Sequence, residues 1–308
     1  MTSKLFGRQS NTHANIFTFL GLPLTRKLTK NVDAVVMGIP YDMATSARPG
    51  TRYGPNGIRQ ASAILRWEQQ RWPWGFRLHE RLHAIDYGDL DFDIGDSQSM
   101  IDQVIEHATF VTEANKFLLS LGGDHFVSLP LLRAVAKTHP MIALLHFDAH
   151  ADTEKTTLEF HHGSMFYRAL QEGIIEPRHS IQIGIRTDYE TTDHPYKVLD
   201  ANWANAHSAD QCIAQIVKTC GKMPVYLTID IDCLDPAFAP GTGTPVAGGL
   251  SSAYLLQVVR GLSALNIIAA DIVEVSPPFD HADITSLAAA TLATDILYLH
   301  ASGLSAPS

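Results

Sequence analysis

Cysteine is scarce in this sequence, which has only Cys212, Cys220 and Cys233 among its 308 residues. Three cysteines without a Cys-x-x-Cys pair form neither a disulfide framework nor a cysteine-based zinc site. We therefore expect reduced thiols and a cytoplasmic protein. The first residues, MTSKLFGRQSNTHANIF, lack a cationic start followed by an apolar stretch, so we also expect no secretory signal.

Long apolar runs and basic clusters are also missing. No apolar run approaches the roughly 18 residues that a membrane span requires, so we expect no membrane partner. Lys and Arg number 23 against 32 Asp and Glu, which gives a formal net charge of −9 at pH 7. This balance argues weakly against a nucleic-acid partner, because binding to phosphates needs concentrated positive charge.

What the sequence does contain is apolar residues: 45% are hydrophobic and 18% are charged, enough for one large core. Short apolar runs, typical of buried parallel strands, alternate with helix-length segments. This alternation predicts an α/β fold with a parallel sheet and helices on both faces. The predicted strands are 33–40, 82–90, 117–125, 141–150, 179–186, 225–232 and 267–275, and the predicted helices are 97–116, 127–138, 208–220, 251–265 and 283–300. No repeat or linker interrupts them, so we predict one domain over residues 1–308, with 1–32 as an N-terminal extension that packs on it or makes subunit contacts.

Ionisable residues stand at the carboxyl ends of four predicted strands, in the segments GGDH (122–125), DAHAD (148–152), DID (230–232) and VEVSPP (273–278). In open α/β sheets, binding sites form at this edge. Residues spaced two apart lie on the same side of an extended chain, so the ionisable residues of DAHAD and of DID should share one face. The glycine pair of GGDH permits a tight turn after its strand.

If these strands are neighbours, four carboxylates and two imidazoles converge; they belong to Asp148, Asp152, Asp230, Asp232, His125 and His150. Carboxylates about 4 Å apart would repel by about 4 kcal/mol per pair at an effective dielectric of about 20. Two divalent cations would balance the four negative charges, as in dinuclear hydrolytic sites. The ligand types suit Mn²⁺ or Mg²⁺, while Zn²⁺, Co²⁺ and Ni²⁺ stay open. A DxD motif alone is more simply explained by turn chemistry, DxHxD alone fits either explanation equally, and GGDH alone is a weak signal, but together they predict a dinuclear metal centre.

These motifs, with DIDCLDPAFAPGTGTPVAGG (230–249), resemble the three signature regions of the ureohydrolase family, which includes arginase and agmatinase. The resemblance runs from about residue 33 to 300. MATSARPGTRYGPNGIR (43–59) and LRWEQQRWPW (65–74) look closest to the bacterial agmatinase branch. The resemblance implies a three-layer α/β/α fold around a parallel sheet of about eight strands, and a homo-oligomer that is a trimer or a hexamer.

The resemblance also implies two Mn²⁺ per subunit. One ion would be held by His125, Asp148, Asp152 and Asp230, and the other by Asp148, His150, Asp230 and Asp232. Asp148 and Asp230 would then bridge the ions. A hydroxide shared by the ions would attack the guanidinium carbon of a substrate, and Asp152 could orient that hydroxide.

Two further residues gain expected roles from the resemblance. His162, in EFHHGSMFY (159–167), matches the histidine that passes a proton to the departing amine, although His161 beside it leaves the assignment open. Glu274 matches the carboxylate that binds the substrate guanidinium through parallel hydrogen bonds. The simpler alternatives are an exposed loop histidine without a role and a salt-bridged glutamate.

The expected reaction is hydrolysis of agmatine to putrescine and urea, a step of putrescine and polyamine biosynthesis. The segment TEKTTLEF (153–160) lacks the Asn-rich stretch through which arginases hold the amino-acid carboxylate, which disfavours arginine as the substrate. The main alternative is 4-guanidinobutanoate amidinohydrolase or another guanidino-compound hydrolase. A single-zinc deacetylase is disfavoured by the six ligands, and an inactive regulatory subunit by the completeness of the set.

Overall fold

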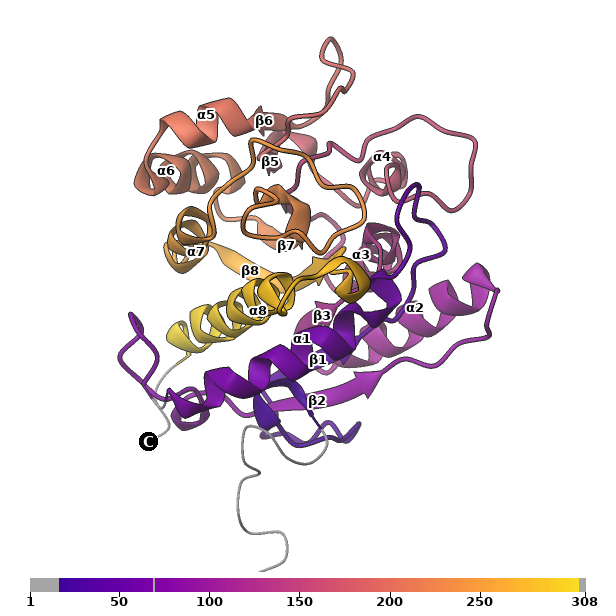
Figure 1. Ribbon diagram of the computed structural model, residues 1–308. Helices are drawn as coiled ribbons and strands as arrows, with labels where there is room; N and C mark the ends of the chain where they lie inside the picture. Colours follow the sequence, from indigo (N-terminus) through magenta and orange to yellow (C-terminus); the bar gives the residue numbers. More distant parts are fainter. Residues whose placement is uncertain (1–16, 69, 305–308) are drawn as a thin grey trace, which may run out of the picture.

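The computed structural model describes residues 17–68 and 70–304. Its centre is an eight-stranded, entirely parallel sheet with the order β2-β1-β3-β8-β7-β4-β5-β6 (Figure 1). The strands are β1 (Ala34–Gly38), β2 (Ala84–Asp89), β3 (Phe117–Leu121), β4 (Ala143–Phe147), β5 (Ile181–Ile183), β6 (Lys197–Leu199), β7 (Pro224–Asp230) and β8 (Asn266–Val273).

Helices cover both faces of this sheet. One layer joins α1, α8, α7 and α6 in lateral contact, and the other joins α2, α3 and α4 (Figure 1). The helices are α1 (Gly54–Ser62), α2 (Ser97–Glu113), α3 (Ser128–Val135), α4 (Met165–Gln171), α5 (Ala201–Ala206), α6 (Ala209–Cys220), α7 (Ser252–Arg260) and α8 (Ile284–Ser302). The expected three-layer α/β/α architecture is therefore confirmed.

Alternation along the strands builds two hydrophobic cores, one on each face. Ala34 and Val36 of β1 point into the core beneath α7 and α8, while Val35 and Met37 point into the core beneath α2 and α3. All five residues of β1 are buried, which explains why its sequence is continuously apolar.

Several helices also begin where the sequence supplies a cap: the Asp96 carboxylate accepts hydrogen bonds at the start of α2, and Ser208 with Gln211 forms a capping box on α6.

The seven predicted strands and five predicted helices all exist, with shifted ends. The structure adds β6, α1, α4 and α5, which the sequence analysis did not list as elements. Each of these has nine residues or fewer, and such short segments are harder to recognise from the sequence than long ones. Their positions depend on the sheet that they pack against.

The described part of the expected N-terminal extension, residues 17–32, lies along β2. Leu24 forms a bridge with Asp86, and the Phe19 N–H donates to the Asp86 carboxylate at 2.7 Å. Phe19 itself is buried. Residues 1–16 of this extension lie outside the described residues, and the domain boundaries stay a prediction.

Helix α8 is apolar on nearly all sides. By length and composition it is the one helix among the described residues that could cross a membrane, but 72% of its most apolar window is buried inside the protein. It packs between α1 and α7, as a core helix does.

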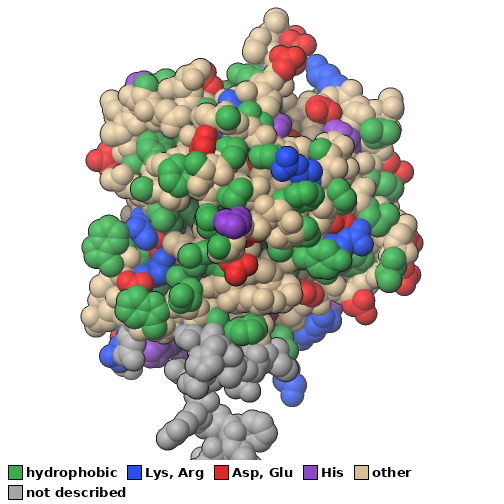
Figure 2. Space-filling view, viewed as in Figure 1, with side chains coloured by type: hydrophobic (Ala, Val, Ile, Leu, Met, Phe, Trp, Pro, Cys, Tyr) green, Lys and Arg blue, Asp and Glu red, His purple; other side chains and the backbone are tan. Residues whose placement is uncertain are grey.

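On the face seen in Figure 2, basic side chains lie among acidic and apolar ones rather than in one patch.

The order of the strands in the sheet determines where the ionisable motifs lie. The four strands that precede the ionisable motifs, β3, β8, β7 and β4, are consecutive neighbours at the middle of the sheet. Phe147 at the end of β4 pairs with Ile229 near the end of β7, and Asp230 pairs with Val273 of β8. All four carboxyl ends therefore reach the same point of the sheet edge.

Candidate metal centre

The carboxylates of the centre come from turns at the ends of β4 and β7. Asp148 follows the last residue of β4, and the chain bends there: the His150 N–H donates to Asp148 Oδ1 at 2.6 Å. The Asp232 N–H donates to Asp230 Oδ1 at 2.8 Å in the same way. The expectation that an extended strand would align these residues was therefore wrong. Side-chain-to-backbone turns bring them together instead.

His125 lies where three of the carboxylates converge. Its Nδ1 atom is 3.1 Å from Asp148 Oδ2, 2.9 Å from Asp152 Oδ2 and 3.4 Å from Asp230 Oδ2. None of these contacts has the direction of a hydrogen bond, and Nδ1 has no hydrogen-bond partner among the described residues. Its other nitrogen, Nε2, is 2.8 Å from Thr228 Oγ1. A buried imidazole nitrogen that makes no hydrogen bond and lies within 3.4 Å of three carboxylate oxygens is the arrangement that a metal ion requires.

His150 forms a second group beside the first. Its Nδ1 atom is 3.2 Å from Asp148 Oδ1 and 3.2 Å from Asp232 Oδ2. Asp148 therefore contributes one oxygen to each group, as a bridging ligand would. The structure brings all six predicted ligands together, and their residue types fit two divalent ions. Their ligand roles, including the bridging role of Asp230, stay predictions.

Burial opposes the charge of these carboxylates. Burial and the neighbouring Asp148 raise the pKa of Asp152 to about 7. Burial and the neighbouring aspartates also raise the pKa of Asp230 well above its usual range. At Asp148 burial acts in the same direction, but the close contacts with His146, His125 and His150 hold its pKa well below its usual range. A site whose carboxylates compete for the available positive charge should bind divalent cations.

The glycines of GGDH are required by close packing. Neither Gly122 nor Gly123 has a positive φ angle. A Cβ atom on Gly123 would lie 1.6 Å from the carbonyl oxygen of Tyr41. The next residue, Asp124, is buried, and its Oδ2 accepts a hydrogen bond of 2.8 Å from the Ala44 N–H. GGDH therefore docks the 42–46 loop beside the metal centre, a role that the sequence analysis missed.

Glu274 links the metal centre to His162. Its backbone follows β8 with a φ of 63°, a strained conformation for a residue other than glycine. Its Oε1 accepts hydrogen bonds from the His125 N–H at 2.9 Å and from His162 Nδ1 at 2.8 Å. Its Oε2 is buried and has no hydrogen-bond partner among the described residues. This free oxygen can accept a donor from a ligand.

Residues of the 241–249 loop form one wall beside that oxygen. A Cβ atom on Gly243 would lie 3.1 Å from Glu274 Oε2. Arg186 holds the same loop by hydrogen bonds of 3.1 and 2.7 Å from Nε and Nη2 to the Val246 carbonyl. The loop is thus fixed close to Glu274, and the missing side chain of Gly243 leaves room there.

His162 is buried, so the alternative of an exposed loop histidine is wrong. Its Nε2 atom is 2.7 Å from Ser46 Oγ, a contact that the sequence did not indicate. Burial alone would lower the pKa of His162, but the hydrogen bond to Glu274 and the nearby negative charges raise it to about 9. His161 instead faces Glu154, with 3.6 Å from Nδ1 to Oε2. The geometry therefore favours His162 over His161 for proton transfer.

His146 was not predicted from the sequence; it is a fully buried residue of β4 whose Nε2 is 2.8 Å from Asp148 Oδ2. The available signal was a histidine inside the apolar run LLHF, two residues before Asp148. A buried histidine in such a run needs polar partners.

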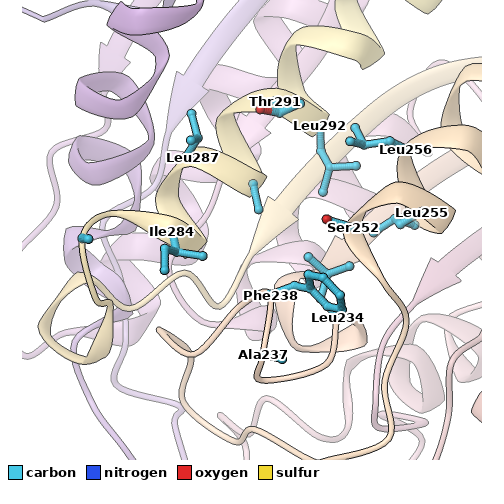
Figure 3. A pocket seen from close by; sticks show the side chains of 12 residues that line it. Leu234, Ala237, Phe238, Ser252, Leu255, Leu256, Ile284, Leu287, Thr291 and Leu292 are labelled. Atoms are coloured by element: carbon cyan, nitrogen blue, oxygen red, sulfur yellow. The ribbon is translucent and has the colours of Figure 1, made fainter.

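A separate cavity of about 300 Å³ lies between α7, α8 and the loop after Asp232 (Figure 3). Leu234, Phe238, Leu255 and Ile284 are among its lining residues, and none of the lining residues is ionisable. This cavity lacks the groups needed for metal binding or proton transfer.

Comparison with known proteins gives consistent matches along the chain. The model of the Arginase family matches residues 32–298. An agmatinase from Photorhabdus laumondii is 52% identical over 98% of this chain and 99% of its own length. An agmatinase from Serratia proteamaculans is 54% identical over 94% of each chain.

Solved structures agree with these matches. A hypothetical agmatinase from Burkholderia thailandensis superposes with a TM-score of 0.92 at 46% identity, covering 95% of this chain and 93% of that one. The proclavaminate amidino hydrolase of Streptomyces clavuligerus superposes with a TM-score of 0.90 at 36% identity, covering 96% of this chain and all of that one.

Removal of one central carboxylate tests the metal centre. We expect the wild-type protein to bind about two divalent ions per chain, as dinuclear sites do. Asp230→Ala should lose both ions, because the remaining carboxylates no longer balance their charge. Metal analysis after dialysis with Mn²⁺ measures this, and Asp91→Ala, at an exposed aspartate, is the control. A wild-type protein with one ion or fewer, or an Asp230→Ala variant with two, would contradict the dinuclear centre.

Proposed function

The chain belongs to the arginase family, and we propose that it hydrolyses agmatine to putrescine and urea with two Mn²⁺ ions. The relatives named agmatinase, which match along almost the whole chain, support this substrate. The structural observation that carries the proposal is the unpaired, buried oxygen of Glu274 on a carboxylate shared with His125 and His162.

The six clustered side chains would hold the two ions. Manganese is proposed because carboxylate oxygens dominate the set, with imidazole in the minority. Bound there, two divalent ions would lower the pKa of a shared water from about 15.7 toward 7, which makes it a nucleophile at neutral pH.

Glu274 would bind the substrate guanidinium. Its Oε1 is fixed by two donors, so the side chain cannot turn away, and Oε2 is left for the N–H groups of the substrate. A guanidinium is planar and cationic, and its hydrogen bonds to a carboxylate are charge-assisted. Because the same carboxylate also accepts from the His125 N–H, the substrate carbon is held next to the metal ligands.

His162 would carry the proton for the departing amine. Its Nδ1 is held by Glu274, the residue that binds the guanidinium, and its Nε2 by Ser46. The Ser46 hydroxyl can donate to Nε2, and the Ser46 N–H donates there at 3.1 Å, so the neutral imidazole accepts at Nε2 and keeps its proton on Nδ1, which donates to Glu274. These contacts hold the ring in one orientation, which suits proton transfer.

We further propose a cytoplasmic homo-oligomer, a trimer or a hexamer, that supplies putrescine for polyamine synthesis. Its three cysteines are buried and free, which suits a reducing compartment. Trp67 and Trp72 are each 73% exposed, whereas Trp74 packs on Tyr298 with 6.0 Å between ring centroids. Large exposed aromatic side chains on an anchored loop support a subunit contact at Trp67 and Trp72.

A substrate panel tests the reaction. Urea release should be measured with agmatine, arginine, 4-guanidinobutanoate and 3-guanidinopropanoate, before and after chelation and readdition of Mn²⁺. We expect kcat/KM for agmatine to exceed that for arginine by more than about tenfold, because no Asn-rich segment holds a carboxylate. Equal hydrolysis of arginine would refute the proposal, and a preference for 4-guanidinobutanoate would establish the alternative.

Replacement of the buried histidine tests the proton transfer. His162→Ala should lower kcat by roughly 10²–10⁴-fold while the metal content stays unchanged, because general acid catalysis contributes that much. His161→Ala is the matched control and should retain kcat, since its side chain faces Glu154 instead. An unaltered kcat in His162→Ala would assign the proton transfer to another group.

One added methyl group tests the guanidinium site. In Gly243→Ala, the new Cβ would crowd Glu274 Oε2 at 3.1 Å and occupy space that the substrate needs. We expect kcat/KM for agmatine to fall by roughly 10–200-fold with the two metal ions retained. Gly303→Ala adds the same group where the nearest atom, the His300 carbonyl oxygen, is 3.5 Å away and should behave like the wild type. Normal kinetics in Gly243→Ala would place the substrate elsewhere.

A further inference from the structure

We propose that His146 and Gln182 form a positioning pair that fixes the Asp148 carboxylate and the 148–152 turn for metal binding. The proposal rests on the function proposed above, because it concerns the same centre. Both side chains are fully buried, and they stand opposite each other in register on β4 and β5. Neither residue is among the six predicted ligands.

The hydrogen bonds of Gln182 show which way its amide points. Gln182 Nε2 donates to the Ala151 carbonyl oxygen at 2.6 Å and lies 2.9 Å from His146 Nδ1. Its Oε1 lies 2.6 Å from His194 Nε2. The reverse orientation would bring the amide oxygen against the Ala151 carbonyl oxygen, so it is excluded by repulsion between two acceptors.

This orientation fixes the proton on His146. An amide nitrogen only donates, so His146 Nδ1 must accept from Gln182. The neutral imidazole then carries its proton on Nε2, which donates to Asp148 Oδ2 at 2.8 Å. The chain of donors therefore runs from His194 through Gln182 and His146 to Asp148.

The pair holds the metal-binding turn at two points. Through His146 it fixes one oxygen of Asp148, the carboxylate that both ligand groups share. Through Ala151 it fixes the backbone between His150 and Asp152. The turn has no helix or strand of its own, so these contacts to the rigid sheet fix its position together with backbone bonds such as that from the Asp148 N–H to the Ile183 carbonyl at 3.1 Å.

Hydrogen bonding by His146 is compatible with bridging by Asp148. Each carboxylate oxygen has two lone pairs, so Oδ2 can accept from His146 and still bind an ion. The donor is neutral, and it therefore orients the carboxylate without adding a positive charge beside two cations. Outer partners of this kind contribute about 10–100-fold to metal affinity.

The positioning pair is tested by a variant that removes the N–H donor of His146 but keeps an aromatic ring at that position. The His146 ring packs on Phe166, with centroids 4.5 Å apart, so His146→Phe keeps an aromatic ring there. Metal-free protein should be titrated with Mn²⁺ while free Mn²⁺ is followed by electron paramagnetic resonance. We expect affinity to fall roughly 10–100-fold in His146→Phe and in Gln182→Met. His300→Phe is the matched control, because His300 stacks on Phe117 at 4.3 Å and should retain wild-type affinity.

A conservative variant separates positioning from packing. His146→Gln places an amide N–H near the position of Nε2 but fills the aromatic space less well. If the donor to Asp148 matters, His146→Gln should bind Mn²⁺ more tightly than His146→Phe. Wild-type affinity in His146→Phe, or weaker binding in His146→Gln than in His146→Phe, would overturn the proposal. The readout needs no substrate, so failure of the wild-type protein to hydrolyse agmatine would count against the proposed function alone.

Discussion

Three carboxylates crowded against the His125 imidazole at the middle of one sheet edge repel one another, and most of the surrounding structure serves to hold them there. Asp148, Asp152 and Asp230 all approach within 3.4 Å of one nitrogen of His125. Such a cluster is costly in a buried position unless a cation compensates it. The protein keeps it in place with a rigid parallel sheet covered by helices on both faces.

Several unusual local features follow from that demand. Asp152 and Glu274 both have positive φ angles, a backbone strain that persists only where surrounding contacts fix it. Gly123 accommodates the Tyr41 carbonyl oxygen, and Gly243 leaves space beside Glu274. Each feature lies next to the carboxylate cluster or to the carboxylate that faces a substrate. The backbone strain at Asp152 and Glu274 and the glycines at positions 123 and 243 are therefore requirements of the geometry of this site.

Glu274 connects the predicted metal centre with the predicted proton carrier through one side chain. It accepts hydrogen bonds from the backbone of His125, a predicted metal ligand, and from the ring of His162, the predicted proton carrier. Its remaining oxygen has no hydrogen-bond partner among the described residues and is the proposed acceptor for the substrate. In the proposed reaction, the rotamer of this one buried residue would therefore set the distances between the nucleophile, the guanidinium and the proton donor, and small displacements would matter.

The sequence by itself determined the α/β class, the seven main strands, and the residues that meet at the sheet edge. These features could be predicted because apolar periodicity and clustered carboxylates are patterns of residues close together in the sequence. It did not determine how those residues meet. The alternation in DAHAD suggested an extended strand, whereas hydrogen bonds between Asp148 and the His150 backbone form a turn. His146, Gln182 and Ser46 have no motif of their own, and their partners lie on other strands or loops. Only the tertiary structure decided these contacts, because the direction of a hydrogen bond between distant segments depends on strand order and register.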